Sequence, residues 1–313
     1  MKKKLILPVI ALITLSIFSS CTYEEVLKHD KPSSSSPTTE KTEVRLSSYI
    51  TRSELSSSRL EGDYWNIGDA IGVFMIEKDS YAIAGEKSNV KYTAEKGGHT
   101  GNFAAKYEKI YFPEDGRKVR FMSYYPYRES IKNGIYNIDV TTQIPQSQLD
   151  LVYSFNSSLT YDKDNGSDNV LIGFKNQMTK IFIHVKNGEG LQGYDLMHMK
   201  VYLAGLSNKA DFDLFSGEIK NLSGFSPIIP SRRIAGNGNV YTGEAVVIPT
   251  SDISNARIVI DLNNSKNEIY EWRLNKALEK GKLYTYNITV NRTGISVNPL
   301  IHNWNIFTQD QDE

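Results

Sequence analysis

The chain has 313 residues, and 40 % of them are hydrophobic, which is enough for two packed domains. Its 36 basic and 36 acidic side chains balance, so its charge gives no reason to expect a nucleic acid or an anionic membrane surface as partner. The single cysteine excludes an internal disulfide bond.

The first twenty residues have the pattern of a secretory signal. Three lysines at positions 2–4 precede an apolar run over residues 5–18, and two serines then lead to Cys21. The run is shorter than the ~20 apolar residues that a transmembrane helix needs. The segment resembles a bacterial lipoprotein signal, which implies cleavage of residues 1–20 and acylation of Cys21 with fatty acids such as palmitate. An ordinary cleaved signal with an incidental cysteine is the alternative.

Residues 21–43 are predicted to be a disordered tether. Between His29 and Glu43 the chain consists mainly of Pro, Ser, Thr, Lys and Glu, with consecutive serines at positions 33–36. A segment of this composition buries too little apolar surface to fold. We expect ordered structure to begin near Val44.

Apolar residues in the first half of the chain predict short strands. Trp65 and a turn at Gly68 precede an alternation of apolar residues that begins at Ile71. Pro126 should end the strand that precedes this proline, because proline has no N–H for a β-ladder. The predicted strands cover residues 44–52, 71–75, 89–94, 109–112, 119–125, 135–140 and 151–154.

The second half of the chain alternates more regularly, as in the run Ile181, Ile183 and Val185. Predicted strands cover residues 181–186, 199–204, 245–248, 256–262, 269–274 and 284–290. Strands at this rhythm, with Gly, Asn and Asp between them and no convincing helix, favour β-sandwiches. We therefore predict an N-terminal β-sandwich domain over residues 44–172 and a C-terminal one over residues 173–313.

The sequence contains no pattern typical of a catalytic or metal site. The five histidines form no His-x-x-x-His pair, and there is no second cysteine and no Gly-x-Ser-x-Gly. Residues 162–168 are similar to a calcium loop, but the position of the glycine and the missing glutamate favour a plain turn. The tyrosines at 124, 125 and 127 could stack on sugar rings or pack in a core. We expect no enzyme activity, no cofactor and no metal.

Five short motifs occur together in this chain. They are Trp65-x-x-Gly68-Asp69-x-Ile71-Gly72-Val73-Phe74, then Tyr124-Tyr125-Pro126-Tyr127, Phe174-x-x-x-Met178-Thr179-Lys180-Ile181, Gly281-Lys282-Leu283-Tyr284-Thr285-Tyr286-x-Ile288-Thr289-Val290 and Ile301-x-x-Trp304. In this order, behind a lipoprotein signal, they resemble the fimbrillin family, the lipoprotein subunits and accessory proteins of type V pili in Bacteroidales. The resemblance implies an all-β fold of two transthyretin-like β-sandwich domains in tandem, without catalysis.

The resemblance also implies proteolytic processing. Many family members travel to the outer membrane as lipoproteins and are then cut after an arginine, which removes the first strand and leaves a groove for a strand of another subunit. The candidate cleavage sites here are Arg45, Arg52 and Arg59, each of which could also be an ordinary surface arginine. Arg52 is favoured because a cut after it would remove the stretch from Val44 to Ile50, the strand whose release would open a groove. The candidate donor or last strand contains Leu300, Ile301, Trp304 and Ile306.

We therefore expect a surface-exposed outer-membrane lipoprotein that is a structural or accessory subunit, at the tip or the anchor, of a type V pilus. It would assemble by donor-strand exchange and contribute to adhesion, with other pilus subunits, the lipid bilayer and a host protein or glycan as partners. The alternative is a monomeric surface lipoprotein that binds a glycan or a host protein. An intact, acylated N-terminus would favour this alternative.

Overall fold

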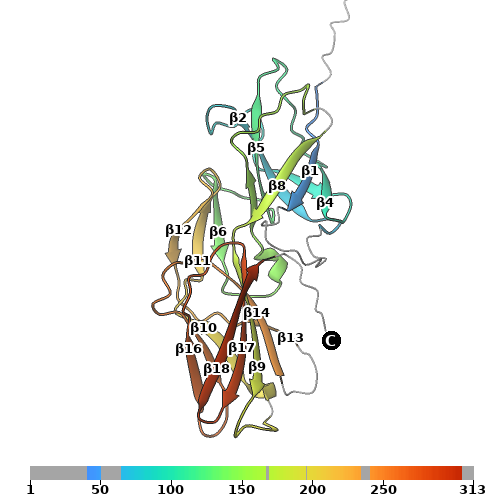
Figure 1. The fold of residues 1–313 in the computed structure, drawn as a ribbon. Helices are drawn as coiled ribbons and strands as arrows, with labels where there is room; N and C mark the ends of the chain where they lie inside the picture. Colours follow the sequence, from blue (N-terminus) through green and yellow to red (C-terminus); the bar gives the residue numbers. More distant parts are fainter. Residues whose placement is uncertain (1–40, 51–64, 167–168, 195, 234–239, 305–313) are drawn as a thin grey trace, which may run out of the picture. The chain divides into compact units, whose positions relative to one another are not determined.

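The computed structural model describes residues 41–50, 65–166, 169–194, 196–233 and 240–304 (Figure 1). Over these residues the chain forms eighteen β-strands and two short 3-10 turns, η1 (Gln146–Gln148) and η2 (Leu196–His198). The predicted all-β class is confirmed. Residues 41–313 belong to one compact unit. The predicted signal and the tether up to residue 40 lie outside the described residues.

Seven strands between residues 46 and 176 form a closed barrel, seen in the blue to yellow-green part of Figure 1. Around the barrel the order is β1 (Leu46–Ile50), β4 (Thr100–Ala104), β3 (Val90–Ala94), β2 (Ala70–Glu77), β5 (Val119–Tyr125), β7 (Val152–Phe155) and β8 (Val170–Asn176). All neighbours are antiparallel except β1 and β8, which are parallel and close the barrel.

Trp65 lies in the core of this barrel. Its ring makes edge contacts with Phe103, Tyr125 and Phe174, at centroid distances of 5.0 to 5.4 Å. Gly101 on β4 permits this arrangement, because a Cβ atom there would stand 2.5 Å from the Phe103 ring and 2.7 Å from the Trp65 ring.

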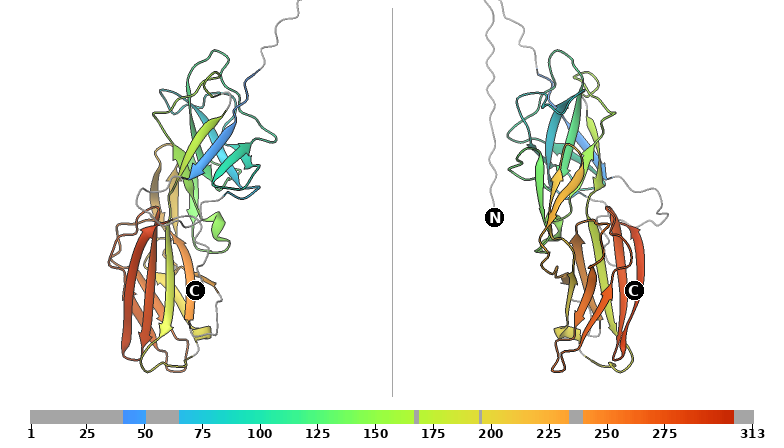
Figure 2. Two further views of the ribbon diagram at one scale, coloured as in Figure 1. Left: turned by 45° about the vertical axis from the view of Figure 1, so that its right-hand side comes forward. Right: turned by 90° about the vertical axis from the view of Figure 1, so that its left-hand side faces the viewer.

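The second half of the chain forms two facing sheets, which Figure 2 shows as separate layers. One sheet has the order β13 (Ser231–Arg233), β14 (Val240–Val247), β9 (Thr179–Asn187), β17 (Lys282–Asn291) and β18 (Gly294–Asn303). The other has the order β10 (Lys200–Ala204), β15 (Arg257–Asp261) and β16 (Ile269–Arg273). Their inner faces share one apolar core, because residues of both sheets belong to a single buried cluster.

A third sheet joins the two halves of the sequence. It has the order β12 (Glu218–Ser223), β11 (Lys209–Asp213) and β6 (Ile135–Asp139), so a strand of the first half pairs with one of the second. The predicted boundary between residues 172 and 173 falls within β8. The division into domains at that point stays a prediction.

Two barrel strands bury both of their faces. On β5 the side chains of Val119 and Phe121 point into the barrel core, whereas Met122 and Tyr124 belong to the core shared with the second half. On β2, Met75 and its alternate neighbours face the barrel, whereas Phe74 and Ile76 face the other core. This explains why neither strand shows a clean apolar and polar alternation.

The predicted strand over residues 109–112 is wrong. There the chain forms only an isolated bridge between Tyr111 and Glu43, with one hydrogen bond from Val44 N–H to Ile110 O and one from Phe112 N–H to Thr42 O, both 2.9 Å. Pro113 follows directly and cannot donate to a longer ladder.

The Gln143 side chain takes the place of a neighbouring strand at the edge of β14. Its amide nitrogen donates to Val246 O at 3.0 Å, and its amide oxygen accepts from Val246 N–H at 2.8 Å. The β13 strand pairs with β14 only as far as Glu244, so the glutamine satisfies backbone groups that no strand reaches.

Gln143→Leu is expected to destabilise the protein by about 2–3 kcal/mol, because it leaves the buried N–H and C=O of Val246 unpaired. Chemical denaturation of the variant measures this loss. The matched control is Gln148→Leu, since that side chain is exposed and should change stability by less than about 0.5 kcal/mol. Equal effects of the two substitutions would contradict the assignment.

Candidate functional site

The first strand is held on both sides by neighbours that are distant in sequence. β1 pairs antiparallel with β4, where Leu46 lies opposite Phe103, and parallel with β8, where Leu46 lies opposite Val170. Residues 51–64, which follow β1 in the sequence, lie outside the described residues. Because β1 alone joins β4 to β8, closure of the barrel depends on this first strand.

The inward face of β1 fills the barrel core. Val44 and Leu46 are buried among the core residues, and Ser48 follows at the next inward position with 0 % of its surface exposed. On the outward face, Arg45 and Tyr49 are exposed. Leu46, together with Val44 just before the strand, inserts an apolar side chain, and Ser48 adds a small polar one. Because the outward Ser47 is also buried, the strand alternates only loosely.

Ser48 is a poor fit for its surroundings. Its hydroxyl oxygen is buried and has no hydrogen-bond partner among the described residues. It lies on β1 opposite Gly101 of β4 and Ile172 of β8, which offer no polar side chain. A buried hydroxyl without a hydrogen-bond partner costs roughly 1–3 kcal/mol, so Ser48 makes the packing of β1 in the barrel less stable.

Ser48→Ala is expected to raise the free energy of unfolding by about 1–2 kcal/mol, because it removes the unpaired hydroxyl and leaves the packing nearly unchanged. Thermal or chemical denaturation tests this. Ser88→Ala, at an exposed position, is the control and should have an effect of a few tenths of a kcal/mol. A loss of stability in Ser48→Ala would show that the hydroxyl has a partner.

The three candidate cleavage sites differ in what they would release. Arg45 precedes β1, and its carbonyl oxygen accepts a 2.7 Å hydrogen bond from Val170 N–H, so a cut after it would leave residues 46–50 in the barrel. Arg52 and Arg59 follow the strand and lie outside the described residues, as does Cys21. Only a cut after residue 50 separates all of β1 from the rest of the chain.

The candidate donor strand is fully paired in this structure. β18 pairs with β17 at ten positions, from Lys282 opposite Asn303 to Asn291 opposite Gly294, and forms the edge of its sheet. Leu300 and Ile301 lie on this strand and are exposed, whereas Trp304 is buried. Ile306 lies outside the described residues. The predicted last strand thus occupies a place in its own sheet.

Comparison with known proteins identifies the family. The sequence profile described as fimbrillin-like matches residues 51–304, well over half of the chain. The chain belongs to the fimbrillin-like family. It is also similar to the "Putative fimbrium subunit Fim1C" of Bacteroides uniformis, with 26 % identity over 275 residues that cover 85 % of this chain and 88 % of that protein.

Two solved structures share the fimbrillin-like fold. A crystal structure titled as a putative cell adhesion protein of Bacteroides uniformis has a TM-score of 0.66 and 24 % identity, and covers 84 % of this chain and 98 % of its own. A second, titled as a putative cell adhesion protein of Bacteroides ovatus, has a TM-score of 0.66 and 21 % identity, and covers 87 % of this chain and all of its own. At these identities the likeness establishes the fold.

This fimbrillin-like chain also contains a buried charged cluster that sequence reasoning missed. Lys180 on β9 and Glu244 on β14 form a buried ion pair with 3.4 Å between Nζ and Oε2, and the Lys180 ammonium lies 5.7 Å from the Trp304 ring. Asp150 is 6 % exposed, and its Oδ1 has no hydrogen-bond partner among the described residues. Burial raises the pKa of the Asp150 carboxyl to about 7, although the positive charge of Lys180 opposes this shift.

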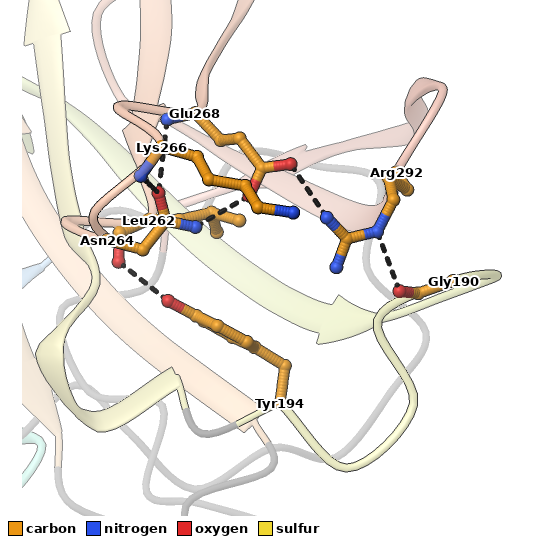
Figure 3. Close-up of polar contacts among 7 residues, drawn as sticks. All are labelled: Gly190, Tyr194, Leu262, Asn264, Lys266, Glu268 and Arg292. Carbon is orange, nitrogen blue, oxygen red and sulfur yellow. Dashed lines mark hydrogen bonds and ion pairs between the residues drawn. The ribbon is translucent and has the colours of Figure 1, made fainter.

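The loops after β9, β15 and β17 are tied together by polar contacts (Figure 3). Arg292 forms a 3.0 Å ion pair with Glu268 and donates from Nε to Gly190 O, while Asn264 donates to Glu268 at 2.6 Å. The Tyr194 hydroxyl donates to Leu262 O at 3.2 Å. These side chains hold loops to one another, which is a structural use of their polar groups.

The candidate calcium loop forms an Asx-type turn. Oδ1 of Asp162 accepts hydrogen bonds from the N–H groups of Asp164 and Asn165, both at 2.9 Å. Across the part of the chain that the structure describes, no three His, Cys, Asp or Glu side chains are grouped to hold a metal ion. Over the same residues, no helix has the length and apolar character needed to span a membrane.

Proposed function

We propose that this fimbrillin-like chain is a structural or accessory subunit of a type V pilus that assembles by donor-strand exchange and contributes to adhesion. In this proposal the two halves of the chain act as tandem transthyretin-like sandwiches, and Cys21 carries the lipid that anchors the newly exported protein in the outer membrane. The observation that supports it most is the position of β1. This strand closes the barrel, and it precedes Arg52 and Arg59 in the sequence.

Removal of β1 would open two ladders at once. β4 and β8 would each lose a paired edge, and the pockets of Val44 and Leu46 would be left empty. Unpaired backbone groups beside empty apolar pockets are costly, so a strand of another subunit would bind there by β-strand addition. The surface location would follow from the same scheme, because a subunit must be exposed on the cell surface to meet the protease that cuts after arginine and the other pilus subunits.

An accessory role at the tip or anchor fits this chain better than a role in the stalk. A stalk subunit must donate a strand as well as accept one. Here Trp304 is buried against Lys180 and β18 is paired with β17 along its whole length, so releasing them would expose core. We therefore propose that the chain accepts a strand and retains its own last strand.

The test uses arginine substitutions in the protein expressed on its native cell surface. In Arg52→Ala combined with Arg59→Ala, the detergent-resistant oligomers of the outer membrane should disappear, because β1 can no longer be released. Arg45→Ala is the control and should retain them, since the strand lies downstream of that residue. Unchanged oligomers in the double variant, or an acylated monomer that binds a glycan or host protein, would contradict the proposal.

A further inference from the structure

The barrel wall has an opening between the end of β7 and the first half of β8. These strands pair at only two positions, Val152 opposite Asn176 and Tyr153 opposite Lys175. Beyond Lys175, towards the beginning of β8, the two strands separate. A groove of about 900 Å³ lies there, and its walls include residues of β1, β7, β8 and the loop after β7. Phe121 of the barrel core lies at its base.

The β8 strand presents a free backbone edge to this groove. Val170 donates its N–H to Arg45 O, so Val170, Ile172 and Phe174 direct their backbone groups to β1. Leu171 and Gly173 must then direct theirs to the opposite side, and Leu171 O indeed accepts a 3.2 Å hydrogen bond from the Tyr161 hydroxyl. In the described part of the chain, the N–H groups of Leu171 and Gly173 have no partner in a β-ladder.

The walls of the groove are apolar at one end and positively charged at the other. Tyr49, Leu159 and Leu171 are 42 %, 49 % and 50 % exposed, which is unusual for large apolar side chains that lie together. Lys175 and Lys280 line the other end. Among the described residues that line the groove there is no carboxylate, so neither lysine meets an acidic partner within it.

We propose that the free edge of β8 binds an extended strand of a partner protein that carries an acidic residue. The strand would pair with the backbone of Leu171 and Gly173, place apolar side chains on Leu159 and Leu171, and direct its carboxylate to Lys175 and Lys280. Backbone pairing supplies affinity in such an addition, and the side-chain contacts supply selectivity. This edge lies opposite the one that β1 occupies, so binding does not require processing of the N-terminus.

The test uses two synthetic peptides and the intact chain with β1 in place. Both contain six alternating Val and Thr residues; one ends in Asp-Glu and the other in Lys-Lys. At low salt the acidic peptide should bind at least tenfold more tightly, because exposed charges act over about 10 Å at 0.1 M salt and further below it. In Lys175→Glu combined with Lys280→Glu the preference should reverse.

Hydrogen exchange locates the bound strand. The acidic peptide should slow exchange at the amides of Leu171 and Gly173 and leave those of Val170 and Ile172 unchanged, because the latter are already paired. Leu171→Pro removes one of the required N–H groups and should weaken binding at least tenfold, with Leu171→Val as the control that keeps both the N–H and an apolar side chain. Equal binding of both peptides, protection elsewhere, or no binding at millimolar peptide would each overturn the proposal.

Discussion

A chain that begins at residue 53 is expected to melt about 10–20 °C below one that begins at residue 41, because loss of β1 should cost more than about 5 kcal/mol. The loss combines the buried side chains of Val44 and Leu46 with two sets of ladder hydrogen bonds. β8 would then remain paired only at Lys175 and Asn176. Differential scanning calorimetry of the two chains measures the difference.

Addition of a peptide that copies residues 41–52 should restore most of the lost melting temperature. A version of this peptide with Ala in place of Ser48 should bind more tightly, because it lacks the unpaired hydroxyl. A peptide of the same composition in scrambled order is the control. If the shorter chain melts at the same temperature as the longer one, β1 does not close the barrel and the strand-exchange scheme fails.

Asp150→Asn is expected to stabilise the protein by about 2–4 kcal/mol at pH 8 and to have little effect at pH 4, in line with 1.36 kcal/mol for each unit of pKa. Burial raises the pKa of the Asp150 carboxyl from 3.8 to about 7, and Glu244 adds to the shift while Lys180 opposes it. The folded state therefore binds this proton more readily than the unfolded state. The stability that the protonated Asp150 carboxyl contributes is complete below pH 4 and is lost as the pH rises through 7.

Chemical denaturation of the wild type and the variant between pH 4 and pH 8 tests this. The useful quantity is the difference between the two proteins, since other carboxylates affect both equally. Asp115→Asn is the control, because that side chain is exposed beside Arg117 and should leave the pH dependence unchanged. A difference that is constant across this pH range would show that Asp150 does not titrate there.

Much of the strand pattern could be predicted from short apolar runs and from the residues that end them. Residues 119–125 form β5 with the predicted bounds, and the alternation at Ile181, Ile183 and Val185 lies within β9. β8 also alternates, with Val170, Ile172 and Phe174 buried, but its position at the predicted domain boundary concealed it. Five strands were missed: β4, β8, β11, β12 and β13.

The missed strands share physical reasons. β12 is exposed on almost every residue, so it has no apolar face to detect. The last strand was predicted around Leu300 and Ile301, but β18 already begins at Gly294. It contains Pro299, which is compatible with an edge strand because its missing N–H can face solvent. Closure of the seven-stranded barrel depends on the parallel pairing of β1 with β8, a contact between residues more than a hundred positions apart that no local pattern reports.

The first strand was predictable from the sequence, whereas the cleavage sites after it stay predictions. The arginines after the first strand could be found from the sequence, and so could the alternation of that strand. The unpaired hydroxyl of Ser48 and the buried carboxyl of Asp150 could not, because each depends on what the fold places around an ordinary polar residue. The role of Gln143 could not be predicted either, because its side chain pairs with the backbone of Val246, which is about a hundred residues away in the sequence.

The most direct test of strand exchange is the N-terminus and mass of the protein recovered from intact cell surfaces. Mass spectrometry of the surface protein should find a chain that begins directly after Arg52 or Arg59, without lipid and without β1. The same protein should be recovered in non-covalent association with a second subunit. An acylated Cys21 followed by every downstream residue would contradict the account, because β1 would then still close its own barrel.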